Sequence, residues 1–459
     1  MIYSKLTAAL QNYPDKPFII SPSGQWSYAD IHRNAWSIAN KLGRINPSRI
    51  AAYMPDSPGL IALVFSAAMH GRSLALINRE LSTGQVRATL KKLRVQLVIS
   101  DSDENLGCEQ LPAGELAESA GAVELAPQVG KFAEAELILL TSGTSGAPKC
   151  IRYLWSDLLA QVVKQTPSDD EHWLLAYRLN HFAGVQMFCH VLVNHSTLVL
   201  TESSSVADAV AAMVEYRVTH VSSTPTFWRF ALAFLVDVRS QLQLRHITLG
   251  SEAVSEDLLR RLQELFPCAR IVHIYALTEA GSCISVSDGK PGLPIAVLQR
   301  PTSAPVQFRV KAGELLVKTR HGMTDYLDQP KLQARDAQGW LATGDLVKIE
   351  GERILFIGRR SETINVGGVK VHPLEVEGAL TSLPGVKLVR VYGRDNPVVG
   401  QIVALDLVVD EGWEPKTVEA AVREACLSLP RHSRPLSINL VNALKTNNFK
   451  LARREAELL

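Results

Sequence analysis

The sequence has little of what marks several large classes of protein. Its most apolar run, Leu60 to Met69, is shorter than the roughly 20 residues that a helix needs to cross a bilayer, so we expect a buried helix and no integral membrane segment. A formal net charge of +2 gives no basic field for nucleic acid. The six cysteines form no CxxC pair, which argues against a zinc site or a disulfide framework.

The first residues also lack a targeting signal. Met1 to Tyr13 carries polar residues throughout, without the apolar core and small-residue cleavage site of a signal peptide. Together with the scattered cysteines, this predicts a cytoplasmic protein. At 459 residues we expect more than one domain.

Strand-like and helix-like segments alternate along the chain, which predicts an α/β fold of mostly parallel sheets covered by helices. Apolar strand-like runs are expected at 50–54, 73–77, 95–99, 197–200, 246–249 and 269–274, and helices at 28–42, 83–93 and 206–215. Near 358–361 the chain becomes charged and polar, and a second alternation follows it. We therefore predict a large domain at 1–358 and a small α+β domain at 359–459.

A loop rich in glycine and hydroxyl groups follows the apolar run that ends at Leu140. Glycines bring backbone N–H groups close to an anion, hydroxyls add donors and a lysine adds a cation, so the loop is suited to hold phosphates. The GK[ST] ending of a Walker loop is absent, which argues against an ordinary P-loop NTPase. Its candidate ligands are Thr141, Ser142, Gly143, Thr144, Gly146 and Lys149.

Further motifs follow in a fixed order. They are YALTE at 275–279, GWLATGD at 339–345, GRRSETI at 358–364, VGGVKVHP at 366–373 and KTNNFKLAR at 445–453. Together with the glycine-rich loop, they resemble the adenylate-forming superfamily of acyl- and aryl-CoA ligases, peptide-synthetase adenylation domains and luciferases. The resemblance covers nearly the whole chain and implies that 359–459 is a mobile lid.

The resemblance also implies roles for the residues of the first motifs. The loop at 141–149 would hold the β- and γ-phosphates of ATP, with Thr141 and Glu279 beside a magnesium ion. Thr278 and Glu279 would contact the α-phosphate, and Tyr275 would lie along the adenine. Gly250 and Ser251 match the other wall of the adenine and acyl pockets. Ala276 stands where the family usually has glycine.

The remaining assignments concern the ribose, the acid and the lid. By resemblance, the Asp345 carboxylate would accept both ribose hydroxyls, helped by Arg359. Lys450 would be catalytic, because its ammonium can offset charge on the α-phosphate. His181 would border the acyl pocket, and Ser361 would be the hinge. Phe449 replaces the glycine that usually precedes the lysine, and because phenylalanine does not adopt a positive φ cheaply, the family's loop geometry is not expected to carry over unchanged.

These roles imply an AMP-forming acid–thiol ligase. It would use ATP and Mg²⁺ to convert a small carboxylic acid into an acyl-adenylate, and then into a thioester with CoA. An alternative enzyme would deliver the acyl group to the phosphopantetheine arm of an acyl carrier protein, and a non-catalytic nucleotide-binding protein is a third hypothesis. We expect a monomer or a homodimer.

Overall fold

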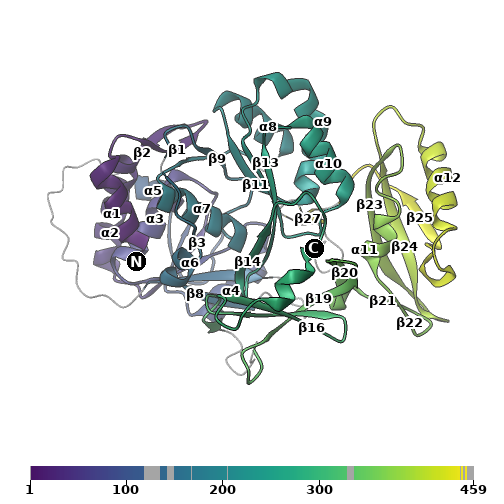
Figure 1. The fold of residues 1–459 in the computed structure, drawn as a ribbon. Coiled ribbons are helices and arrows are strands. Elements are labelled where there is room, and N and C mark those ends of the chain that lie inside the picture. The colour runs from purple at the N-terminus through teal and green to yellow at the C-terminus, as the bar shows by residue number, and fades with distance from the viewer. Residues whose placement is uncertain are drawn as a thin grey trace.

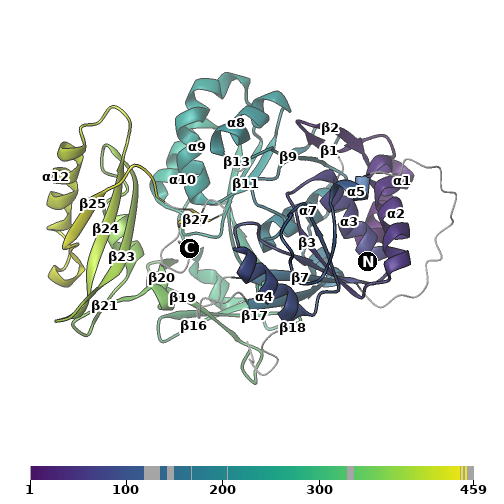
Figure 2. The same ribbon diagram turned by 180° about the vertical axis from the view of Figure 1, so that it is seen from behind.

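The computed structural model describes residues 2–117, 135–141, 149–166, 168–203, 205–327, 335–444, 446–447 and 450–451. Figure 1 shows a large region, purple to green, and a smaller yellow-green region beside it. Figure 2 shows the same division from behind. The α/β class predicted from the alternation is confirmed.

The first layer is a seven-stranded sheet in the order β18-β8-β7-β4-β3-β5-β6. Its pairs from β7 to β6 are parallel, whereas β8 pairs antiparallel with both β7 and β18. The strands span Arg49–Tyr53 (β3), Ser73–Leu76 (β4), Leu97–Ser100 (β5), Glu109–Leu111 (β6), Glu136–Thr141 (β7), Lys149–Leu154 (β8) and Asp325–Tyr326 (β18).

Most helices of this layer share one large apolar core, and α4 packs into a separate, smaller core. Helix α3 is buried along nearly its whole length, as predicted for the run from Leu60. Helix α2 begins at a capping box in which Ser27 and Asp30 bond each other's backbone. The helices span Ile2–Asn12 (α1), Tyr28–Ile45 (α2), Pro58–Met69 (α3), Thr83–Leu93 (α4), Gly114–Ala117 (α5), Trp155–Ala160 (α6) and Phe182–Asn194 (α7).

The second layer is an eight-stranded sheet in the order β14-β13-β12-β11-β9-β10-β1-β2, parallel except at its two outermost pairs. Helices Val206–Glu215 (α8), Pro225–Val238 (α9) and Glu256–Leu265 (α10) bury their apolar faces in its second core. The strands span Pro17–Ser21 (β1), Gly24–Ser27 (β2), His172–Leu174 (β9), Thr197–Val199 (β10), His220–Ser223 (β11), His246–Gly250 (β12), Arg270–Leu277 (β13) and Gly281–Val286 (β14).

A five-stranded sheet, β15-β20-β19-β17-β16, completes the large region with antiparallel pairs. It has its own small core, to which β13 and β14 contribute. The strands span Leu293–Pro294 (β15), Val306–Lys311 (β16), Glu314–Thr319 (β17), Leu341–Glu350 (β19) and Arg353–Arg359 (β20).

The carboxyl-terminal region, 364–451, is here called the lid. Its main sheet runs β22-β21-β24-β23 with β25 parallel to β24, and a separate core lies between this sheet and two helices. The elements are Ile364–Val366 (β21), Val369–Val371 (β22), Pro373–Gly378 (α11), Val386–Asn396 (β23), Gly400–Val409 (β24), Pro415–Cys426 (α12), Ser437–Leu440 (β25), Thr446–Asn447 (β26) and Lys450–Leu451 (β27). The boundary at 358/359 stays a prediction.

The sequence-based segments match closely. Helices α4 and α8 have the predicted bounds. Strand β13 continues through Leu277, so Tyr275 lies inside the strand instead of following it, because β14 pairs antiparallel with this stretch. In the described part of the chain, no helix is both long and apolar enough to cross a membrane.

Candidate functional site

The predicted phosphate contacts come together where the first two sheets meet. The Tyr153 hydroxyl donates a hydrogen bond to the backbone carbonyl of Thr278. The Tyr326 hydroxyl donates to Glu279 Oε1 at 3.1 Å. Lys149 Nζ lies 5.2 Å from the centre of the Tyr326 ring. Tyr326 of β18 thus links Glu279 to the lysine that closes the phosphate loop, and Tyr153 of β8 holds the neighbouring Thr278.

The strand pairing explains this arrangement. β18 pairs with β8, so Tyr326 lies opposite Ile151, and β7 pairs with β8, so Thr141 lies opposite Lys149. The two ends of the predicted phosphate loop are therefore neighbours. Ser142, Gly143, Thr144 and Gly146 lie outside the described residues.

Asp345 is the centre of a second cluster. It is 7% exposed, and its Oδ2 accepts a hydrogen bond from the Tyr275 hydroxyl at 2.7 Å. Its Oδ1 lies 3.1 Å from Arg359 Nε, because the two residues are directly opposite each other on β19 and β20. Its backbone N–H donates to Thr343 Oγ1 at 3.0 Å. The carboxylate is thus held by side chains of β13 and β20, and it keeps acceptor capacity on both oxygens.

The Asp345 carboxylate keeps both of its partners protonated. Burial, followed by the nearby Asp345 carboxylate, raises the pKa of Tyr275 well above its ordinary value. The Asp345 carboxylate raises the pKa of Arg359. Tyr275 therefore remains a neutral donor, and its ring stacks on Phe356 at 5.1 Å. Its predicted position along the adenine stays a prediction.

Gly250 and Ser251 lie at the carboxyl end of β12, next to Tyr177. The Tyr177 hydroxyl donates to the Gly250 carbonyl at 3.1 Å and interacts with the Ser251 side chain. A Cβ on Gly250 would lie 3.3 Å from that hydroxyl, so a glycine allows the approach. Glu252 Oε2 accepts the backbone N–H of Thr226 at 3.0 Å, which ties this wall to the first turn of α9.

His181 immediately precedes α7, at the N-cap position, and close backbone packing fixes its loop. Its N–H donates to the Arg178 carbonyl at 3.1 Å. A Cβ at Gly184 would lie 2.1 Å from that same oxygen, which requires glycine there. The next side chain, Phe182, stacks on Tyr153 at 5.7 Å, so the histidine loop adjoins the residue that bonds Thr278.

Asp56, in the turn between β3 and α3, supports this loop. Its Oδ1 accepts the Leu179 N–H at 3.2 Å, and burial raises the pKa of its carboxyl to about 6. The charges of Arg178 and Arg79 oppose that rise. Sequence reasoning missed Asp56, because its partner lies in a loop far along the chain.

A cavity of about 380 Å³ lies beside β14, the strand that follows Glu279. The Gln161 side-chain oxygen accepts the Ser282 N–H at 2.8 Å, and a Cβ on Gly281 would lie 2.3 Å from that oxygen. The polar lining also includes Arg300 and His321. Sequence reasoning missed this cavity too, because its wall combines α6, β14 and the third sheet.

The predicted lid residues are only partly described. Ser361 lies in a short 3-10 turn, Arg360–Glu362, between the third sheet and the lid. The backbone of Lys450 belongs to β27, which pairs with β26 and lies against α9. The Lys450 side chain and the whole of Phe449 lie outside the described residues.

Two family descriptions match the sequence. That of the AMP-binding enzymes covers residues 6–327, and that of the AMP-binding enzyme C-terminal domain covers 375–450. The chain belongs to the AMP-binding enzyme family. The membership predicted from the motifs is confirmed.

Relatives of this AMP-binding enzyme include CoA ligases. It is 25% identical over 460 residues to the 2-succinylbenzoate–CoA ligase of Bacillus pumilus, with 95% of this chain and 93% of the relative covered. It is 27% identical over 417 residues to the feruloyl-CoA synthase of an Amycolatopsis species, with 84% of each chain covered.

Two solved structures share the fold of the AMP-binding enzyme. One is the Bacillus subtilis o-succinylbenzoate CoA synthetase in complex with its acyl-adenylate, with a TM-score of 0.77 and 22% identity, covering 98% of this chain and 96% of that one. The other is an anthranilate CoA ligase with anthranoyl-AMP, with a TM-score of 0.82 and 19% identity, covering 98% and 95%.

Proposed function

We propose that this enzyme activates a carboxylic acid with ATP and then transfers the acyl group to the thiol of CoA. In the first step a carboxylate oxygen attacks the α-phosphorus, the bond to the β-phosphate breaks and pyrophosphate leaves. In the second step the thiol sulfur attacks the acyl carbon, the proton leaves the sulfur and AMP departs. The observation that carries the proposal is the buried Asp345, held by Tyr275 and Arg359, in a chain of this family.

Each cluster has one task in this scheme. Asp345 has acceptor capacity for the two vicinal hydroxyls of a ribose. Lys149 supplies a cation at the loop end for the leaving pyrophosphate. Thr278 and Glu279 lie between these two clusters, where the α-phosphate would be. Lys450 would offset the charge that develops there from the lid side.

The residues fit a magnesium ion brought in with ATP. Mg²⁺ is usually held by one or two carboxylates together with substrate phosphates. Among the described residues no group of three or more acidic, histidine or cysteine side chains is arranged around a metal position. A single carboxylate, Glu279, beside the phosphate loop suits a shared site of this kind, and bound Mg²⁺ would neutralise phosphate charge.

For the acid, we propose an aromatic carboxylate. The relatives named above are described for 2-succinylbenzoate, ferulate and anthranilate. Phe182 of the His181 loop packs on aromatic Tyr153, and the cavity at β14 has room and polar groups for ring substituents.

Pyrophosphate exchange across a panel of aromatic and fatty acids is the direct test. We expect acid-dependent exchange with at least one aromatic acid, and AMP release that depends on added CoA. Exchange without AMP release on CoA, but with transfer to a phosphopantetheinylated carrier protein, would favour the alternative acceptor. Absence of exchange with every acid would contradict the proposal.

We also propose a cytoplasmic monomer or homodimer. All six cysteines are free thiols, as in a reducing compartment. Light scattering of the purified protein would determine the oligomeric state, and cell fractionation would test the location.

A further inference from the structure

The lid sheet has two different faces. On β23, Val389 and Val391 point into the lid core with helices α11 and α12. Leu388, Arg390 and Tyr392 alternate with them and therefore occupy the opposite face. In Figures 1 and 2, α12 lies on the outer side of the sheet, so this opposite face turns toward the large region.

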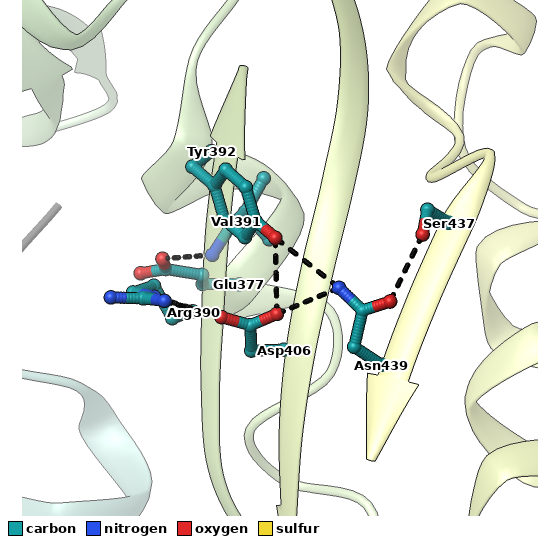
Figure 3. A network of polar contacts seen from close by, with 7 residues as sticks. All are labelled: Glu377, Arg390, Val391, Tyr392, Asp406, Ser437 and Asn439. Atoms are coloured by element: carbon teal, nitrogen blue, oxygen red, sulfur yellow. Dashed lines mark hydrogen bonds and ion pairs between the residues drawn. The ribbon is translucent and has the colours of Figure 1, made fainter. Parts of the chain in front are cut away.

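Part of the inward face is a polar network that pairs within the lid (Figure 3). Arg390 forms an ion pair with Asp406, which is 7% exposed at its side chain. Asp406 Oδ1 accepts hydrogen bonds from the Tyr392 hydroxyl at 3.1 Å and from Asn439 Nδ2 at 2.9 Å. Both oxygens of the buried carboxylate are thus satisfied by the lid itself, whatever the position of the large region.

The rest of the inward face is apolar, and it touches the large region. Leu388 and Val408 lie opposite each other on β23 and β24, and together with Leu444 they form a buried cluster. Phe230, on helix α9 of the large region, packs against this cluster. An apolar contact therefore joins α9 to the lid.

The position of Leu444 gives this contact its importance. Leu444 precedes Lys450 by six residues, and the paired strands β26 and β27 that carry Lys450 follow it directly. β27 itself lies against α9. The first turn of α9 is bonded to Glu252, beside the predicted adenine and acyl wall. The contact between α9 and the cluster that contains Leu444 thus lies at the base of the segment that presents Lys450.

We propose that Phe230 is a positioning residue for the first half-reaction, which latches the base of the Lys450 segment to the large region while the acyl-adenylate forms. The inference rests on the proposed function. Apolar packing has no directional bonds, so the contact can open and re-form as the lid moves, and the self-paired polar network leaves no buried charge unmatched when it opens. The second half-reaction does not require the latch.

The matched pair of variants is Phe230→Ala and Phe234→Ala. Phe234 lies one turn further along α9, is 44% exposed and lies outside the cluster. We expect Phe230→Ala to lower the rate of pyrophosphate exchange about tenfold, because fewer molecules hold the lid in place. Thioester formation from supplied acyl-adenylate should be unchanged, Phe234→Ala should match wild type, and Phe230→Leu should restore most of the exchange. Equal loss in both half-reactions would overturn the proposal.

A distance measurement tests the latch without any substrate. Spin labels on exposed Cys268 and on Val398→Cys in the lid, in a Cys108→Ser background, report the separation of the two regions. Phe230→Ala should broaden the distance distribution, and Phe234→Ala should not. If all variants gave the wild-type distribution, the latch would be wrong. If wild type showed no exchange with any acid but Phe230→Ala still broadened the distribution, only the proposed function would fail.

Discussion

The two edges of the eight-stranded sheet use polar residues in opposite ways. At the carboxyl ends of the strands, Gly250, Ser251 and Tyr275 join hydrogen-bonded groups that surround the predicted nucleotide site. At the amino ends, β9, β11 and β12 each begin with a histidine, and these are His172, His220 and His246. Here the rings of His220 and His246 pack against Trp173 and against each other, as apolar side chains would.

The histidine edge is built around Trp173. Its ring centre lies 4.5 Å from that of His220, 4.7 Å from that of His190 and 5.9 Å from that of His246. Burial, followed by the charges of neighbouring histidines and arginines, lowers the pKa of His220 to about 3 and that of His246 to about 4. These imidazoles are therefore neutral at physiological pH and act as flat packing groups.

The comparison teaches that residue type alone does not indicate a site. The carboxyl edge combines a buried carboxylate with an arginine of opposite charge and a neutral tyrosine that donates a hydrogen bond to it. The histidine edge has several imidazoles, but no described carboxylate is bonded to His220 or His246. These two imidazoles are therefore more stable in the neutral form. The surroundings of the side chains at the two edges, and not their residue types, explain why we predict a nucleotide site at the carboxyl edge only.

The largest expected effect is a loss of stability in acid that comes from the histidine edge. The unfolded chain binds protons on histidine near pH 6.5, whereas folded His220 and His246 stay neutral to about pH 3 and 4. Their contribution to the free energy of unfolding is fully present above pH 6.5 and is lost as the pH falls toward 4. Between pH 7 and 5 the free energy of unfolding should fall by about 2 kcal/mol for each histidine. Urea unfolding at several pH values measures this.

The control is a double variant, His220→Phe with His246→Phe. It keeps flat rings at the amino edge and should reduce the loss of stability between pH 7 and 5, while His432→Phe, at an exposed position in the lid, should leave it unchanged. An unaltered pH dependence in the double variant would show that other groups control acid unfolding.

At the other edge, Asp345→Ala should raise the KM for ATP about a hundredfold, because two ribose hydroxyls lose a charged acceptor. The matched control is Asp288→Ala, which removes a carboxylate paired with Arg353 at 2.6 Å on the surface. That variant should keep the wild-type KM. Steady-state kinetics at varied ATP measure both, and a change confined to the KM for the acid would refute the ribose assignment.

Tyr275→Phe should have the smallest effect. It removes one hydrogen bond of 2.7 Å to Asp345 and leaves the ring on Phe356, so we expect the KM for ATP to rise by about three- to tenfold. A rise as large as that of Asp345→Ala, in protein with unchanged thermal unfolding, would indicate a separate role for the hydroxyl.

Local signals predicted much of the fold. Helix α4 begins after Ser82, whose side chain exchanges bonds with Gln85, and such a capping box is visible in the sequence. The family motifs likewise identified Asp345 and Arg359, whose opposed positions the structure now describes. Their roles with ATP remain predictions.

Contacts between distant segments could not be predicted. Tyr326 reaches Glu279 only because β18 pairs with β8, which lies far earlier in the chain. Trp173 meets His220 and His246 through the register of parallel strands, which alternation alone does not specify. Asp56 and Phe230 depend on how whole layers pack.

The close approach at Gly184 limits how the protein can be re-engineered. Any side chain there would collide with the Arg178 carbonyl, a backbone atom that cannot rotate away, and would displace the turn that carries His181. Combinatorial libraries intended to change acid preference should therefore keep glycine at position 184. If the proposed role of the β14 cavity holds, its lining positions, such as Ser285, are the ones to vary. At position 184 even a single added methyl group would distort the backbone, whatever its effect on selectivity.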